Sequence, residues 1–163
     1  MTGPTVVNHD LSLLAPRFRA VVDAAVAECQ NLPDKLDVMV FEAFRSGERQ
    51  AWLYAQGRTR PGSVVTHARS NLTSWHGYGL AIDVVHRTKF WNPFGSNSAQ
   101  NDAWFARVGA VFKKHGCNWG GNWTRPDTPH MQWARCSASP SPGAITLVQQ
   151  KGIVAVWDQL AAN

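Results

Sequence analysis

The sequence is poor in cysteine and lacks the spacings that cysteine-based structures need. Its 163 residues include three cysteines, Cys29, Cys117 and Cys136, and no Cys-x-x-Cys pair. An odd number leaves at least one thiol unpaired. The composition therefore argues against a disulfide-stapled secreted scaffold and against a structural zinc site made of cysteines.

Long apolar runs are also missing. No segment has the roughly 20 consecutive apolar residues that a membrane-spanning helix requires. Residues 1–16 lack the basic start and apolar stretch of a signal peptide, so we expect a protein made in the cytoplasm without one. If its substrate lies outside the cytoplasm, another route must release it.

Clusters of basic residues are scarce, although the net charge is +5. Lys113 and Lys114 form the only adjacent basic pair, and no basic stripe suited to nucleic acid is visible. We therefore expect no nucleic-acid partner. The positive charge favours electrostatic contact with an anionic cell wall or outer membrane.

What the sequence does contain is typical of a globular domain. Hydrophobic residues make up 44% and charged residues 17% of the chain, so disorder is not expected. Eight tryptophans are many for this length. Indole rings pack in cores, but they also line concave sites and stack on sugars, so a carbohydrate-containing substrate is compatible with the composition.

Apolar periodicity predicts helices mixed with short strands. Pro16 suits the first turn of the first helix, and Ser46 suits the cap of the second. The expected helices cover 11–29, 48–56, 102–115 and 144–162, and the expected strands cover 35–43, 79–85 and 131–133. Residues 92–100 are expected to form a loop. This pattern indicates an α+β fold with helices packed on a small antiparallel sheet.

The length fits one domain. We expect residues 1–136 to form the catalytic domain. Residues 137–163 then form a short Ser/Pro linker and a C-terminal helix docked on the same domain.

The most informative stretch is 74–83, SWHGYGLAID, which is followed much later by DTPH at 127–130. His76 and Asp83 can occupy a turn and the strand that leaves it, and His130 can join them from a distant loop. Two imidazoles and one carboxylate leave a fourth tetrahedral position for water, as a catalytic zinc site requires.

Neighbouring residues support this interpretation. An ionised Asp83 in an apolar strand needs a partner such as a cation. Small residues at Gly77, Gly79 and Ala81 would let the backbone pass close to a metal. Asp127, on a loop stiffened by Pro129, is the expected general base and then acid.

The pattern Ser-x-His-x-x-Gly-x-Ala-x-Asp with a later Asp-x-Pro-His resembles the zinc peptidases of the D-alanyl-D-alanine peptidase and Hedgehog superfamily. Within it, the chain is most similar to the L-alanyl-D-glutamate endopeptidases of phage endolysins and related wall hydrolases. EAFRSGERQ at 42–50 and WGGNW at 119–123 also resemble family segments, although Asn122 stands where relatives often have Asp.

The resemblance implies a Hedgehog/DD-peptidase-like fold and a set of site residues. It assigns Zn²⁺ to His76, Asp83 and His130, and proton transfer to Asp127. Arg45 would bind substrate or stabilise the oxyanion, because a guanidinium suits developing negative charge. A surface salt bridge of Arg45 with Glu42 or Glu48 is equally compatible with the sequence. Ser74 would bind substrate.

Three functions remain open at this point. The first is a monomeric endolysin that cleaves the L-Ala–D-Glu bond of peptidoglycan, leaves the host cytoplasm through a holin and lyses the cell wall. The second is a D-Ala-D-Ala carboxypeptidase or dipeptidase with the same metal chemistry. The third is a non-catalytic zinc-containing binding module, against which the presence of Asp127 argues.

Overall fold

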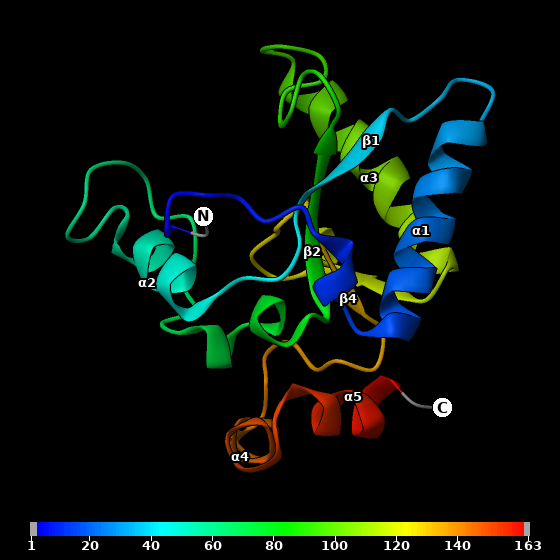
Figure 1. Cartoon of the computed structure of the whole chain (residues 1–163). Coiled ribbons are helices and arrows are strands. Elements are labelled where there is room, and N and C mark those ends of the chain that lie inside the picture. Colours follow the sequence, from blue (N-terminus) through cyan, green and yellow to red (C-terminus); the bar gives the residue numbers. More distant parts are fainter. Residues whose placement is uncertain (1–2, 162–163) are drawn as a thin grey trace.

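The computed structural model describes residues 3–161 as a mixed fold built around a small antiparallel sheet (Figure 1). In these residues the sheet has four strands in the order β1-β2-β4-β3. The strands are β1 (Val38–Glu42), β2 (Ala81–His86), β3 (Cys117–Trp119) and β4 (His130–Trp133). The expected α+β class is confirmed.

Two long helices cover the sheet. Helix α1 (Pro16–Asn31) and helix α3 (Ser98–Lys114) pack against each other, and they contact β1 and β3 respectively (Figure 1). The apolar residues of α1 that recur at helical spacing include Phe18 and Val22, which are fully buried. Their burial against residues of β2 such as Ile82 forms the core that holds the central strand in place.

Helix α2 (Gly47–Ala55) lies away from α1 and α3 in Figure 1. It begins, as expected, at Ser46, whose side chain accepts a hydrogen bond from the Arg49 amide. Four short 3₁₀ turns complete the described chain. They are η1 (Leu11–Leu13), η2 (Asn71–Thr73), η3 (Trp75–Tyr78) and η4 (Gly120–Asn122).

The C-terminal segment folds back onto the core as α4 (Pro142–Lys151) and α5 (Ile153–Ala161). Indole N–H groups connect it to the rest of the protein. Trp133 donates to the Leu160 carbonyl at 2.7 Å and Trp157 donates to the Tyr78 carbonyl at 2.6 Å. No helix within residues 3–161 combines the length and apolar character needed to cross a membrane.

The expected secondary structure was wrong in several places. Helix α1 begins at Pro16 and not at residue 11, which starts the 3₁₀ turn η1. Helix α3 starts at Ser98 instead of 102, because the Asn97 side chain caps it by accepting from the Gln100 amide. The single helix expected over 144–162 is two helices as far as residue 161, since Gly152 adopts φ 82° and ends α4; residue 162 lies outside the described residues. Strand β3 was not expected at all, and it forms through its pairing with β4.

Candidate metal centre and active-site cleft

Three neighbouring strands place polar side chains side by side. In the register of the sheet, Asp83 of β2 lies opposite Glu42 of β1 on one side and opposite His130 of β4 on the other. Each of these residues is separated from the others by a long stretch of sequence, so the antiparallel pairing is what assembles them. Asp83 occupies the centre of this row.

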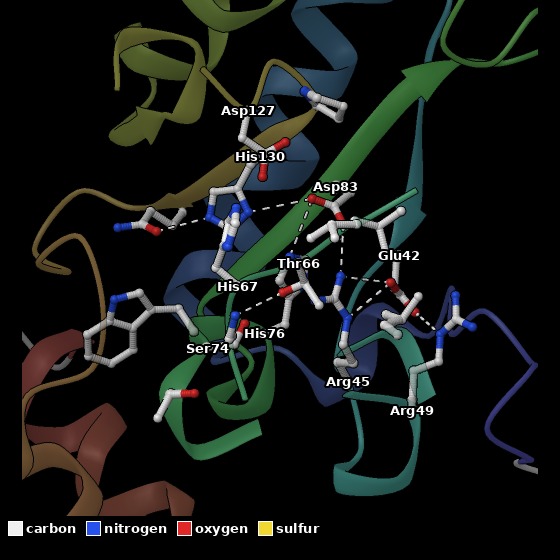
Figure 2. A pocket seen from close by; sticks show the side chains of 18 of the residues that line it. Glu42, Arg45, Arg49, Thr66, His67, Ser74, His76, Asp83, Asp127 and His130 are labelled. Atoms are coloured by element: carbon white, nitrogen blue, oxygen red, sulfur yellow. Dashed lines mark hydrogen bonds and ion pairs between the residues drawn. The ribbon is translucent and has the colours of Figure 1, made fainter. Parts of the chain in front are cut away.

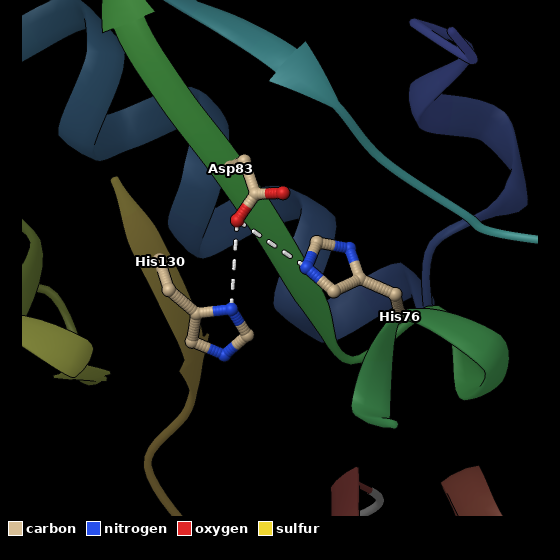
Figure 3. A group of neighbouring side chains, drawn as sticks. All are labelled: His76, Asp83 and His130. Carbon is tan, nitrogen blue, oxygen red and sulfur yellow. Dashed lines mark ion pairs between the residues drawn. The ribbon is translucent and has the colours of Figure 1, made fainter. Parts of the chain in front are cut away.

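His76 completes the group from η3, the turn that precedes β2 (Figure 3). Its Nε2 atom lies 3.4 Å from Asp83 Oδ1, and His130 Nδ1 lies 3.5 Å from the same oxygen. One ligand atom from each of the three residues lies within 4.8 Å of the other two, an arrangement that could hold a metal ion. The structure thus brings together the three predicted metal ligands.

Hydrogen bonds on the far side of each imidazole fix which nitrogen faces Asp83. His76 Nδ1 lies 3.0 Å from the Ala43 carbonyl oxygen, which can only accept, so Nδ1 carries the proton. Nε2 therefore presents its lone pair to the site. A carbonyl or amide oxygen in this outer position is typical of metal-binding histidines.

For His130, two consecutive hydrogen bonds determine which imidazole nitrogen carries the proton. The Gln132 amide nitrogen donates to the Ser137 carbonyl at 2.8 Å, which turns Gln132 Oε1 toward His130 Nε2 at 3.0 Å. Nε2 must then be the donor, and Nδ1 presents its lone pair to Asp83. When both imidazoles are neutral, the lone pairs of His76 Nε2 and His130 Nδ1 point toward the negative Asp83 Oδ1. These three electron-rich atoms repel one another, and a cation bound between them would remove the repulsion. The donor set therefore fits a divalent metal.

The ionisation of the three residues follows from their surroundings. Burial and the nearby Arg45 guanidinium lower the pKa of His76. For His130, burial opposes protonation, but the hydrogen bond and the charge of Asp83 outweigh it and raise the pKa. Burial likewise opposes ionisation of Asp83, yet the histidines and Arg45 hold its pKa well below the usual range. Asp83 is therefore an anion and a competent metal ligand.

Arg45 is anchored beside the cluster of His76, Asp83 and His130 (Figure 2). The side chain is buried, and its Nη2 atom donates to Glu42 Oε2 at 2.8 Å and to Asp83 Oδ2 at 3.0 Å. Nη1 donates to Gln50 Oε1 at 3.1 Å, and Glu42 also accepts from Arg49 at 2.7 Å. Arg45 thus leaves Asp83 Oδ1 directed at the histidines. Its expected contact with substrate stays a prediction.

Asp127 lies beside the cluster on the loop between η4 and β4 (Figure 2). Its amide donates to the Gly120 carbonyl at 3.0 Å, and its carbonyl accepts from the His130 amide at 3.1 Å, so the loop is fixed at both ends. Partial loss of solvent and the negative charge of Asp83 raise the pKa of the Asp127 carboxyl. A carboxyl group with a raised pKa is suited to transferring protons.

These residues face a cleft of about 1120 Å³. Ser74 lines it, so a substrate contact by Ser74 is sterically possible. Trp123 forms part of the wall, with its ring centroid 4.9 Å from that of His130. Val64, Val65 and Trp91 line the same cleft as His76, Asp83 and His130.

One expectation about the local backbone was wrong. Gly77 and Gly79 make room for other backbone segments and not for a metal. A Cβ at Gly77 would collide with the Asn71 carbonyl, and a Cβ at Gly79 would lie 2.5 Å from the Leu13 carbonyl oxygen. Gly79 also has φ 63°, which L side chains rarely adopt.

Sequence reasoning missed the support residue Gln132 and gave Glu42 only a surface role. A signal for Gln132 existed, because it lies two positions after His130 and so on the same face of a strand. An uncharged polar residue in a buried strand needs a partner. Glu42 was considered only as a partner of Arg45 in a surface salt bridge, whereas the pair is buried.

Comparisons with known proteins match this region. The family model described as D-alanyl-D-alanine carboxypeptidase matches residues 67–133, which contain the three clustered residues and Asp127. The peptidoglycan L-alanyl-D-glutamate endopeptidase CwlK of Bacillus subtilis (strain 168) is 38% identical over 125 residues, covering 73% of this chain and 72% of that protein. The solved L-Ala D-Glu endopeptidase ChiX of Serratia marcescens is 24% identical, with a TM-score of 0.49 over 76% of this chain and 82% of that chain.

Proposed function

The chain belongs to the D-alanyl-D-alanine carboxypeptidase family of metallopeptidases, which includes peptidoglycan endopeptidases, and from this membership we propose that it cleaves the L-Ala–D-Glu amide bond of peptidoglycan. The observation that carries the proposal is the convergence of His76, Asp83 and His130 beside Asp127, in one cleft. The similarity to CwlK supports the choice of bond.

We propose zinc as the ion held by His76, Asp83 and His130. Two imidazoles and a carboxylate suit zinc and leave room for one more ligand. When bound, zinc supplies Lewis-acid activation of water and of the scissile carbonyl. The protein contributes ligands whose orientation is fixed by Ala43, Gln132 and Arg45 before any ion arrives.

Asp127 performs the proton transfers in this proposal. Its carboxylate oxygen accepts a proton from the attacking water and then delivers it to the nitrogen of the leaving D-Glu residue. The loop contacts at Gly120 and His130 hold this carboxylate beside the metal ligands. Ser74 hydrogen-bonds the substrate from the wall of the cleft.

Arg45 acts in this proposal through Asp83 and through the positive potential it adds behind the reacting carbonyl. A fixed cation near the site lowers the energy of the negatively charged tetrahedral intermediate. Its three carboxylate and amide partners keep it from swinging toward solvent.

A D-Ala-D-Ala carboxypeptidase is the second candidate, because the matching family model carries that description. The two activities need different clefts. A carboxypeptidase closes one end with a cation for the terminal carboxylate, whereas an endopeptidase lets the chain continue on both sides. The 38% identity to CwlK, an L-alanyl-D-glutamate endopeptidase, favours the endopeptidase.

Mass spectrometry of fragments released from purified peptidoglycan tests the proposal. The zinc-loaded protein should create new N-terminal D-Glu, and a chelator-treated sample should not. Released D-alanine would instead identify a carboxypeptidase. Intact substrate from several wall types, with zinc bound, would favour a non-catalytic zinc-containing module.

We further propose that the enzyme is bacteriolytic, in the manner of an endolysin, and works as a monomer. The net charge of +5 supports attraction to an anionic wall. Loss of turbidity in permeabilised cell suspensions should follow its addition, with a rate that falls as salt screens the attraction. Cells that stay intact while isolated peptidoglycan is cut would limit the enzyme to wall remodelling.

A further inference from the structure

Three aromatic rings gather on the surface where β1 meets the loop after β2. The ring centroids of Phe41 and Trp91 are 4.7 Å apart, those of Phe41 and Phe90 are 6.4 Å apart, and Phe90 and Trp91 stack at 6.0 Å with an angle of 26°. We call Phe41, Phe90 and Trp91 the aromatic platform. Isolated exposed apolar residues are ordinary, but three in mutual contact form a surface.

Two members of the platform are held open to solvent. Phe90 is 42% exposed and Trp91 is 46% exposed. The backbone of Phe90 has φ 53°, a left-handed conformation that is unfavourable for a bulky residue. Two hydrogen bonds between Phe90 and His86 hold this turn closed. An aromatic side chain kept on a strained, exposed turn does not serve the core, and such strain is often found at binding sites.

The platform is continuous with the active-site cleft. Phe41 and Trp91 line the same cavity as Asp83, Asp127 and His130. Phe41 directly precedes Glu42, which lies opposite Asp83 in the sheet. A ligand part resting on the platform would therefore belong to the molecule whose amide bond reaches the metal ligands.

We propose that the aromatic platform binds a sugar ring of the peptidoglycan glycan strand, an inference that rests on the proposed function. In peptidoglycan the L-Ala amine is linked to the lactyl group of N-acetylmuramic acid. One residue spans about 3.5 Å, so the sugar lies within roughly two to three residue lengths of the scissile bond. A site that cuts after L-Ala must place this sugar close to the cleft.

The chemistry of the platform fits a sugar better than another protein. Flat rings stack on the C–H faces of a pyranose, while polar groups at the rim bond its hydroxyls and N-acetyl group. Thr88, Lys89 and Asn92 are exposed polar residues next to Phe90 and Trp91 in the sequence, and they are available for such bonds. Three rings are far smaller than the roughly 800 Å² per partner that a stable protein interface buries.

The test compares two substrates that share the scissile bond. One is the free stem peptide, and the other is the same peptide on N-acetylmuramic acid. For the zinc-loaded Trp91→Ala variant, KM on the muramyl peptide should rise about tenfold, which corresponds to 1.4 kcal/mol, while KM and kcat on the free peptide stay near those of the wild type. In Trp91→Phe, KM on the muramyl peptide should stay close to the wild-type value, because phenylalanine keeps a flat ring at this position.

Phe94→Ala is the matched control. Phe94 is 49% exposed on the same loop but is not part of the platform, so its removal should leave both substrates unchanged. Phe90→Asn removes a platform ring while keeping a residue that tolerates the left-handed backbone. It should weaken muramyl-peptide binding without lowering the melting temperature.

Binding to peptide-free glycan oligomers, measured by calorimetry, gives a readout independent of catalysis. The wild type should bind them and Trp91→Ala should bind about tenfold more weakly. Equal loss on both substrates, or wild-type glycan binding in Trp91→Ala, would overturn the platform proposal. Failure of the wild type to cut either substrate would overturn the proposed function instead, and the glycan measurement would still decide the platform.

Discussion

At the scale of single residues, the sharpest assignment concerns Asp127. Asp127→Asn removes the proton acceptor but keeps the shape of the side chain, so kcat should fall by roughly 10²–10⁴-fold. Zinc content and melting temperature should stay at wild-type values, because Asp127 is not one of the three clustered ligands. Steady-state kinetics and metal analysis measure both. If Asp127→Asn keeps most of the wild-type activity, Asp127 is not the proton-transfer residue.

Gln132 gives a second prediction at this scale. Gln132→Leu removes the acceptor for His130 Nε2, so the imidazole is free to rotate and to change tautomer. Zinc affinity should fall by roughly 10–100-fold, as for other outer partners of metal ligands, and competition with a chelator measures it. Gln30→Leu is the control, since Gln30 on α1 also donates to a backbone carbonyl, that of Val38 in β1, and has no bond to the three clustered residues. Unchanged affinity in Gln132→Leu would contradict this role of Gln132.

The contrast between these two residues shows what sequence can give. Asp127 was predictable because it stands at a fixed spacing from His130 within a few residues. Glu42 was not assigned to the site, because the strand pairing that sets it opposite Asp83 exists only in the folded sheet. Gln132 stands two residues after His130, but the sequence does not show that the Ser137 carbonyl orients its side chain toward that imidazole. Sequence patterns report neighbours along the chain more readily than the supporting bonds between distant segments.

At the scale of elements, the turn η4 controls where Asp127 sits. A Cβ at Gly120 would lie 2.5 Å from the Asp127 carbonyl oxygen, so Gly120→Ala must displace the loop. A shift of about 1 Å can cost a factor of about 100 in rate, and we expect such a loss in kcat with most of the zinc retained. Gly143→Ala, where the nearest atom is 3.7 Å away, should be silent. Equal activity of the two variants would show that the loop position is not critical.

Helices α1 and α3 are joined by a charge cluster that predicts acid sensitivity. Glu28 accepts from Lys114 at 2.8 Å and from His115 at 2.6 Å, and these bonds lower the pKa of Glu28. As pH falls, the unfolded chain takes up this proton first. The stabilisation is therefore present above about pH 4.3, the unfolded value, and is lost as pH falls through the lowered folded pKa.

Calorimetry across pH would measure this effect with Glu28→Gln. The melting temperature of the variant should lie below that of the wild type at pH 7, and the gap should close in strong acid. Asp158→Asn, at an exposed site on α5, is the control for removing one negative charge. A gap that is independent of pH would assign the loss to packing and not to charge.

Element types were more predictable than element boundaries. The apolar periodicity of α1 and the Ser46 cap of α2 are local features, and both helices form, although α1 begins at Pro16 and not at residue 11. The position of Gly152 at a helix break and the pairing of β3 depend on tertiary packing, which overrides local preference.

At the scale of the whole molecule, the C-terminal segment supports the site. The Ser137 carbonyl accepts from Gln132 at 2.8 Å and from the Trp75 indole at 2.7 Å. A division of the chain at residue 136 would therefore separate His130, a proposed metal ligand, from the carbonyl that fixes its orientation through Gln132. The predicted catalytic domain 1–136 and the segment 137–163 are best treated as one functional unit.

The metal should stabilise the whole fold, because its ligands come from η3, β2 and β4. At free zinc of a hundred times Kd, binding contributes about 2.7 kcal/mol. For a domain of this size that corresponds to a rise in melting temperature of roughly 5–11 °C. Chelation should remove this increment in the wild type and in Asp127→Asn, as measured by calorimetry. His76→Ala should melt at the same temperature with and without zinc, since one ligand is gone. If chelation leaves the melting temperature of the wild type unchanged, the three residues are held together by hydrogen bonds alone.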